Sequence, residues 1–303
     1  ARGGMGSITQ AMSKSLLANG GNIKAGSAVK NILIKNNRTY GLALENGDEI
    51  YADKIVSNLD VKRTFLKVVE KKELPSEFYT AVKNFKIRGS SGKLNIALDD
   101  KPIWKSIPKD DPASTGDLHF TQSIEEMEGA YDDWKDGKWS TLPYVDMCIP
   151  TLNDPTMAPQ GKHYMSVFVQ YVPYNLADGG WTEEKRVQFG DHVMKRIGNY
   201  STNFKDIILH AEVRTPKELE AEVGLTEGNI FQGELTMDQL MFSRPIPGYA
   251  QYKSPIKNLY MCGSSTHPGG GVMGAPGANA ARVILSDLGK KIKSHYLSAI
   301  MII

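Results

Sequence analysis

The chain has 303 residues, 41% of them hydrophobic and 23% charged, which is enough apolar sequence for one large or two moderate globular domains. Its 36 basic and 34 acidic residues nearly cancel and form no long block of one sign, so the charge pattern excludes a nucleic-acid-binding footprint. Cys148 and Cys262 lie far apart, which excludes a C-x-x-C redox pair and a thiolate metal site and indicates a reducing compartment.

The two ends of the chain give further expectations. The first residues, ARGGMGS, contain no initiator Met and no signal segment, so we expect a piece of a longer protein. No run of about eighteen apolar residues occurs, which predicts no transmembrane span. The apolar tail 296–303 follows the basic segment 290–293, and either docking on the core or peripheral membrane contact fits this pattern. We expect a cytoplasmic location in a bacterium and a mitochondrial one in a eukaryote.

The first part of the chain predicts a helix followed by a small β-meander. Ser7 and Gln10 have the spacing of a capping box, and the apolar period ends at Gly20-Gly21. Asn46-Gly47 is a strong two-residue hairpin signal. The predicted strands are 22–25, 28–35, 39–44, 49–52 and 54–57, and helical segments follow near 61–69 and 75–85.

The middle of the chain predicts an antiparallel sheet with helices. Strand patterns occur at 93–98, 117–122, 144–149 and 164–171, and another at 207–213. Thr182 begins a helix to about Ile197, and Thr215-Pro216 with Glu218 begins another. Prolines make 243–255 an extended connection into the last segment.

Residues 258–285 predict a short strand, a glycine-rich turn and a helix. Glycine lets a backbone approach a ligand closely, and the amides at a helix N-terminus are unpaired donors at the positive end of a dipole. The literal G-x-G-x-x-G at 269–274 is not a dinucleotide fingerprint, because residues 264–268 separate it from the strand and no second strand follows. A turn that only lets the helix pack closely on a sheet stays open as the alternative.

Four segments of the chain resemble the later part of phytoene-dehydrogenase-like flavoproteins. They are GGMGSITQAMSKSLLANGGNIKAGSAVKNI, KIVSNLD, NIFQGELTMDQLMFSRP and LYMCGSSTHPGGGVMGAPGANAA, in this order. The resemblance implies an α+β fold, the C-terminal portion of a two-domain FAD-linked oxidoreductase whose N-terminal Rossmann unit is absent here. It implies FAD-domain segments at 1–59 (helix and meander) and 246–303 (strand, loop, helix and tail), with a substrate domain of mixed or antiparallel sheet at 60–245.

The same resemblance implies the cofactor-binding residues. Val29 matches the position whose backbone meets adenine, and Gly263 and Ser264 match the turn beside the ribityl chain. The segment whose backbone faces the flavin pyrimidine edge corresponds to Gly271, Val272 and Met273. Amides at a helix N-terminus there would stabilise the negative charge that reduction places on the flavin.

The candidate catalytic residues are few. His267 is either a residue that steers a proton near the flavin or a turn histidine bonded to backbone, and no carboxylate lies near it in sequence to orient it. The hydroxyls at 264–266 lack a G-x-S-x-G elbow and suit a ribityl chain better than nucleophilic attack. The other histidines show no ligand spacing, so no metal site is expected. Aromatic side chains could line a substrate pocket or serve ordinary packing: Trp104, Trp134, Trp139, Trp181, Tyr171 and Tyr174.

The sequence thus leads to two functional hypotheses. The first is an FAD-dependent oxidoreductase that moves hydride from an apolar or amphipathic small molecule to flavin N5. We expect this chain alone not to retain FAD, because part of the implied site is missing. The second is a flavin-fold protein of interaction or regulation, in which the cofactor is structural or lost.

Overall fold

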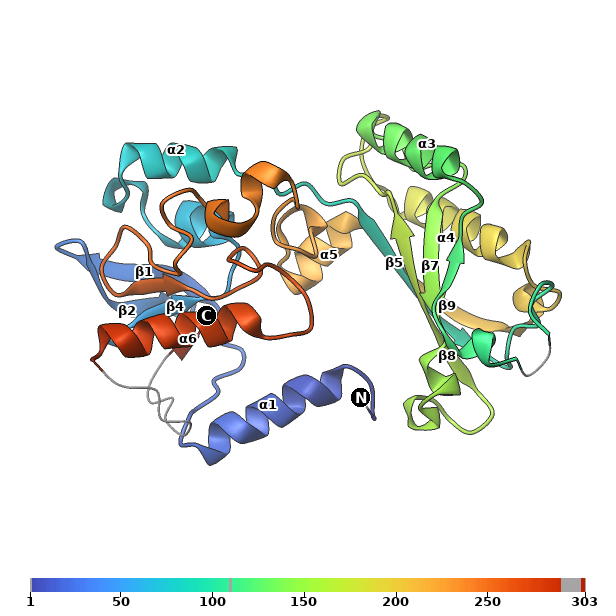
Figure 1. Ribbon diagram of the computed structural model, residues 1–303, viewed down its shortest axis with the longest axis horizontal. Helices are drawn as coiled ribbons and strands as arrows, with labels where there is room; N and C mark the ends of the chain where they lie inside the picture. The colour runs from blue at the N-terminus through green and yellow to red at the C-terminus, as the bar shows by residue number, and fades with distance from the viewer. Residues whose placement is uncertain (1, 109–110, 290–300, 303) are drawn as a thin grey trace. The chain divides into compact units, whose positions relative to one another are not determined.

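The computed structural model describes residues 2–108, 111–289 and 301–302, which form two compact units (Figure 1). Unit 1 contains residues 1–11 and 89–228, and unit 2 contains residues 12–88 and 229–303. The structural boundaries differ from those expected at 59/60 and 245/246, because residues 60–88 and 229–245 pack with the terminal segments.

Unit 1 is built on a five-stranded antiparallel sheet with the order β6-β7-β8-β5-β9. The central pair β5–β8 extends over eight residues, from Ser91 opposite Gln170 to Leu98 opposite His163. Side chains of β8 alternate in burial, as expected for a sheet with one face on the core. The strands are β5 (Ser91–Leu98), β6 (Leu118–Phe120), β7 (Tyr144–Cys148), β8 (His163–Gln170) and β9 (Ile208–Arg214). The predicted antiparallel sheet is confirmed.

Three helices belong to this unit: α3 (Ile124–Lys135), α4 (Glu183–Gly198) and α5 (Pro216–Val223). Helix α4 runs along the sheet (Figure 1) and contributes Phe189, Val193 and Ile197 to the core. The predicted starts are confirmed, since Thr182 accepts a hydrogen bond from Lys185 N–H and Thr215 forms a capping box with Glu218. Local capping chemistry therefore sets both helix starts.

The aromatic residues of unit 1 mostly serve packing. Trp104 lies in the core, while Trp139 and Trp181 stack with ring centroids 5.3 Å apart and pack against it. The Trp134 indole N–H donates to Gly89 O. Burial and hydrogen bonding account for these indoles without a ligand.

A buried ion pair ties α3 to α4. Arg196 and Glu126 are paired, with side-chain exposures of 7% and 11%, and Arg196 Nη2 also donates to Phe120 O at 3.0 Å. A guanidinium in such a place has little access to water, so its stability depends on the carboxylate.

Replacing Glu126 with Gln should leave this guanidinium without its countercharge and lower the free energy of unfolding by about 3 kcal/mol. Urea denaturation would measure the change. Glu128→Gln, on the same helix but exposed, is the matched control and should change stability by less than about 0.5 kcal/mol. Equal effects of the two substitutions would show that the pair is not stabilising.

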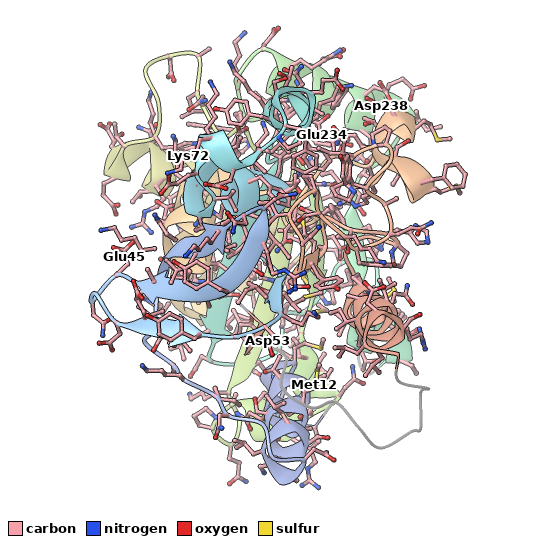
Figure 2. All side chains as sticks on the ribbon, turned by 90° about the vertical axis from the view of Figure 1, so that its left-hand side faces the viewer. Met12, Glu45, Asp53, Lys72, Glu234 and Asp238 are labelled. Atoms are coloured by element: carbon pink, nitrogen blue, oxygen red, sulfur yellow. The ribbon has the colours of Figure 1, made fainter. Side chains whose placement is uncertain are left out.

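Unit 2 contains two three-stranded sheets. The first is the antiparallel meander β1 (Val29–Lys35), β2 (Arg38–Leu44) and β3 (Glu49–Tyr51). Asn36 and Asn37 have φ of 51° and 56°, as the tight turn between β1 and β2 requires. Glu45, which is labelled in Figure 2, lies in the next turn, between β2 and β3. The second sheet is parallel, with the order β10-β4-β11, and consists of β10 (Leu259–Met261), β4 (Ile55–Ser57) and β11 (Met301–Ile302).

The helices of unit 2 are α2 (Ser76–Asn84) and α6 (Ala275–Asp287), with a π-helix at Arg63–Val68. Helix α1 (Gly6–Ala18) crosses the boundary between the units in sequence. Buried Ala280 and Ile284 of α6 pack against Val56 and Tyr260, so this helix covers the parallel strands. Within the described ranges, no helix combines the length and apolarity needed to cross a bilayer.

Two local predictions are wrong. Ser7 is not an N-cap: α1 already begins at Gly6 after Gly3 and Gly4 turn with positive φ, and the Ser7 hydroxyl donates to Gly4 O. Residues 22–25 form no strand, because they are exposed and no neighbouring strand pairs with them. Of the tail expected to dock or to meet a membrane, only Met301–Ile302 is described, and it pairs with Ile55 and Val56. This short strand follows α6, so the expectation that no second strand follows the glycine-rich turn is also wrong.

Besides the boundary within α1, the chain passes between the units at 88/89 and at 228/229, and these two places adjoin. Asn229 Nδ2 donates to Arg88 O at 2.8 Å, which holds the two ends of unit 2 together. On the other side of this boundary, a Cβ on Gly89 would lie 1.8 Å from Glu227 O and 3.2 Å from Gly228 C. Only glycine allows this close approach of the two segments.

Candidate functional site

The candidate site lies at the carboxyl ends of β4 and β10. These parallel strands pair Leu259 with Ile55 and Met261 with Ser57, and Cys262 N–H continues the ladder to Ser57 O at 2.8 Å. The chain leaves both strands at the same edge, into residues 58–60 and into the glycine-rich turn 263–274. In open sheets with parallel strands, ligands bind outside this edge.

Gly263 brings the two exits into contact. A Cβ at this position would lie 2.3 Å from Asn58 O, so any larger residue would push the turn away from β4. The same Cβ would lie 3.1 Å from Gln232 Oε1, a buried acceptor for which the described residues provide no hydrogen-bond donor. This edge therefore combines a close backbone approach with a buried polar acceptor that a ligand or a water molecule could satisfy.

The hydroxyl groups of Ser265 and Thr266 in the turn form hydrogen bonds within the protein. Ser265 and Thr266 are 0% exposed. The Ser265 hydroxyl donates to Gln232 O at 2.6 Å and accepts from Val61 N–H at 3.1 Å, while Thr266 Oγ1 donates to Gly263 O at 2.8 Å. These two residues fix the shape of the turn. Neither is placed to act as a nucleophile or to face a ribityl chain.

Arg244 is the main support beneath the turn. Its side chain is 0% exposed, and its guanidinium donates to Ser264 O from Nε at 3.0 Å and from Nη2 at 2.9 Å. The remaining bonds go to carbonyl groups of the segment before it: Phe231 O at 2.7 Å, and Glu234 O and Gln239 O at 3.3 Å each. One side chain thus joins the loop 229–243 to the glycine-rich turn.

The Arg244 guanidinium is charged at neutral pH. Burial lowers its pKa to about 10, which is still far above neutrality, and every hydrogen bond that the structure shows for it goes to a main-chain carbonyl. Carbonyl dipoles stabilise the cation without cancelling its charge. The positive potential of this group therefore extends to the turn 263–270.

Helix α6 begins directly after the turn. Gly274 precedes it with φ 63°, Pro276 occupies the first turn, and Val272 and Met273 are 74% and 58% exposed. Because the first amides of a helix lack intrahelical partners, this end presents donors and a positive dipole. Gly271, with φ 139°, lies in the same exposed segment, so Gly263, Ser264 and the 271–273 segment form one continuous loop.

Of the other two predicted site residues, Val29 lies far from this loop in the chain and His267 lies within it. Val29 begins β1 and pairs with Leu44 of β2 in the meander of the same unit. His267 is exposed within the turn, and its carbonyl accepts a hydrogen bond from the Tyr252 hydroxyl at 2.8 Å. Asn279 of α6 in turn donates to Tyr252 Oη at 2.9 Å, which links the His267 backbone to the helix.

Burial disfavours the thiolate form of both cysteines. Burial raises the pKa of the Cys262 thiol to about 11, and burial also raises the pKa of Cys148. Both are free thiols. The thiol form is the weaker nucleophile, so Cys262 packs as a small apolar residue at the end of β10. The described residues also hold no group of three His, Cys, Asp or Glu side chains that could bind a metal ion.

Sequence reasoning missed Arg244 and Gln232. Both lie in the segment NIFQGELTMDQLMFSRP, which was used only to support the resemblance. The available signal was an arginine within a largely apolar stretch before a proline, and its burial depends on how residues 229–243 fold around it.

Residues 1–285 match the family described as flavin containing amine oxidoreductase. The chain belongs to this family. A flavin-containing amine oxidoreductase fold agrees with the mixed α/β architecture and with its antiparallel sheets, and the resemblance to phytoene-dehydrogenase-like flavoproteins is confirmed.

Two curated relatives and one solved structure illustrate the similarity. The chain is 36% identical over 295 residues to pyridine nucleotide-disulfide oxidoreductase domain-containing protein 2 of Rattus norvegicus, covering 95% of this chain and 51% of the relative. It is 26% identical over 275 residues to the zeta-carotene-forming phytoene desaturase of Myxococcus xanthus, covering 89% and 49%. The fold is similar to that of an oxidoreductase from Methanosarcina mazei, with a TM-score of 0.54, 17% identity, and coverage of 94% and 55%. The chain spans about half the length of these relatives.

The residues of the turn fit part of an FAD molecule. Gln232 Oε1 offers an unsatisfied acceptor, the α6 amides offer donors, and the places of a Cβ at Gly274 and Gly277 are open space. This set suits the polar edge of a flavin and its hydroxylated chain.

Replacing Arg244 with Met should leave three carbonyl groups, of Phe231, Gln239 and Ser264, without donors and lower the free energy of unfolding by about 3 kcal/mol or more. Chemical denaturation would measure the loss. The control is Arg282→Met on exposed α6 surface, where the change should stay within about 0.5 kcal/mol. A small effect at Arg244 would contradict its assigned structural role.

Proposed function

We propose that this protein is an FAD-dependent oxidoreductase that oxidises an apolar or amphipathic small molecule. The observation that supports this most directly is the glycine-rich turn at the carboxyl edge of β4 and β10, supported by a buried guanidinium, in a chain of the flavin containing amine oxidoreductase family. Bound FAD would supply the redox chemistry, accepting a hydride at N5.

The residues of unit 2 would hold one end of the cofactor. Gly263 and Ser264 would line the ribityl chain, and the backbone of Gly271–Met273 with the first amides of α6 would face the pyrimidine edge. These amides and Arg244 provide positive potential where reduction adds negative charge, and their positions are fixed before the ligand arrives. Val29 would meet the adenine.

The two units would have different roles, one in binding the flavin and one in binding the substrate. In this proposal unit 2 is the flavin part and unit 1, with its antiparallel sheet, is the substrate part. An apolar substrate is supported by the carotenoid in the name of the Myxococcus xanthus relative. His267 is exposed in the turn and is the candidate there for a side chain that orients substrate or takes part in proton transfer.

The proposal is tested by expressing the full-length gene product, reconstituting it with FAD and recording its visible spectrum. A flavin spectrum that bleaches under anaerobic conditions with an apolar donor would support it. Absence of bound flavin would overturn it. Bound flavin that no donor reduces, in a protein that co-purifies with a stable partner, would favour the alternative role in interaction or regulation.

Gly263 provides a sharper test of the site. Gly263→Ala introduces a Cβ 2.3 Å from Asn58 O, which should displace the turn and weaken FAD binding at least tenfold, or about 1.4 kcal/mol. Flavin fluorescence titration would measure the affinity. Gly129→Ala on the exposed surface of α3 is the control outside the proposed site, because nothing lies within 4 Å of its added Cβ. Equal affinities of the two variants would contradict the placement of the flavin at this edge.

A further inference from the structure

A second pocket lies at the opposite edge of the same two strands. Its cavity of about 310 Å³ is lined by Arg38, Lys54, Lys253 and Lys257, among other residues. Lys54 directly precedes β4, and the 253–258 segment leads into β10, so the pocket is at the amino ends of these strands. The glycine-rich turn leaves their carboxyl ends, which makes the two sites separate places in unit 2.

The side chains that line this pocket carry a net positive charge. Four cationic side chains face one carboxylate, Asp287, which leaves an excess of three positive charges. The whole chain carries a formal charge of only +2. The basic residues also come from three separate segments of the chain, so their convergence is a property of the fold. Such a concentration of one sign attracts anions.

Two of the cations are held side by side by the backbone. Thr39 N–H donates to Lys257 O at 3.1 Å and Lys257 N–H donates to Asn37 O at 3.0 Å, which fixes Arg38 next to Lys257. Neither side chain has an acidic partner among the residues that the structure describes. Like charges at such a position repel each other, and a bound anion would remove this cost.

The other two cations are positioned by side chains. Lys54 Nζ donates to Asn258 Oδ1 at 2.8 Å, a neutral partner that orients the amine and leaves its charge in place. Lys253 Nζ donates to Asp287 Oδ1 at 2.7 Å, and the Tyr260 hydroxyl donates to Asp287 Oδ2 at 2.9 Å. Both carboxylate oxygens are therefore occupied. The hydrogen bond from Lys253 holds the pKa of Asp287 below its usual range, so this group stays ionised and neutralises only one lysine.

We propose that this pocket binds a phosphate group, with Arg38 and Lys257 as its main ligands and Lys54 as a third. A guanidinium presents paired N–H donors that match phosphate oxygens, and ammonium groups add point charges. The ligand is a phosphomonoester or inorganic phosphate in solution, or the phosphate headgroup of a lipid. The chemistry of recognition is the same for these sources.

The first experiment measures binding of inorganic phosphate to the purified protein by calorimetry at low salt. The test variant is Arg38→Gln with Lys257→Gln, and the matched control is Lys30→Gln with Lys83→Gln, which removes the same charge from exposed positions of unit 2 outside the pocket. We expect the test variant to bind at least tenfold more weakly, and the control to change affinity less than twofold. Equal weakening in both variants would overturn the proposal, because it would show only a general charge effect.

A second arm distinguishes the sources. Vesicles of phosphatidylcholine alone and with phosphatidic acid are mixed with the three proteins and sedimented. Binding to phosphatidic acid vesicles that the test variant loses and the control keeps assigns the ligand to a membrane headgroup. Phosphate binding without vesicle binding assigns it to solution. Binding of neither probe by the unaltered protein would overturn the proposal, and unchanged circular dichroism and melting of the variants would show that folding is not the cause.

Discussion

The buried guanidinium of Arg244 is the interaction on which the candidate flavin site depends. The turn 263–270 is rich in glycine, so its shape depends on the buried hydroxyl groups of Ser265 and Thr266 and on contacts from outside the turn. Arg244 provides them through Ser264 O and through three carbonyl groups of the segment 229–239. Arginine suits this role because its five donors lie in one plane and it keeps its charge at neutral pH even when it is buried.

The parallel strands β4 and β10 give unit 2 two chemically different edges. At the carboxyl ends, glycines, amides and one buried cation form a site for a ligand with both apolar and polar parts. At the amino ends, side-chain cations surround a small cavity. Helix α6 spans the distance between these edges, since it starts at the glycine-rich turn and ends with Asp287 in the basic pocket. Its packing on Val56 and Tyr260 fixes both ends relative to the strands.

Much of this fold could be predicted from the sequence because local chemistry determines it. The Thr215–Glu218 capping box, the Thr182 cap and the strand-turn-helix at 258–285 were correct, as each depends on residues close in sequence. The failures at Ser7 and at residues 22–25 have a common cause. Both structures depend on information that the local sequence pattern does not contain. The N-cap depends on where Gly3 and Gly4 place the first turn of α1, and a strand at 22–25 would need a neighbouring strand to pair with.

The candidate site was predictable only in part. Glycine spacing and the family resemblance indicated residues 263–274, whereas the support by Arg244 depends on contacts between segments about 20 residues apart. Burial of a charged side chain is rare, and no local sequence pattern predicts it. The basic pocket was missed for a similar reason: Arg38 and Lys257 are distant in sequence and become neighbours only through the bridge between β2 and the approach to β10.

The adjoining crossings at Arg88–Gly89 and Gly228–Asn229 make residues 89–228, the larger part of unit 1, an insertion into unit 2, while residues 1–11 of unit 1 precede unit 2 in the chain. Because the chain leaves and returns at neighbouring points, the whole of 89–228 could be replaced by a few residues, or by a different domain with closely spaced ends, without altering the path of unit 2. Such a replacement could arise in evolution as well as by protein engineering. A lineage could exchange the inserted module and acquire a new specificity while the glycine-rich turn and its arginine support stay unchanged.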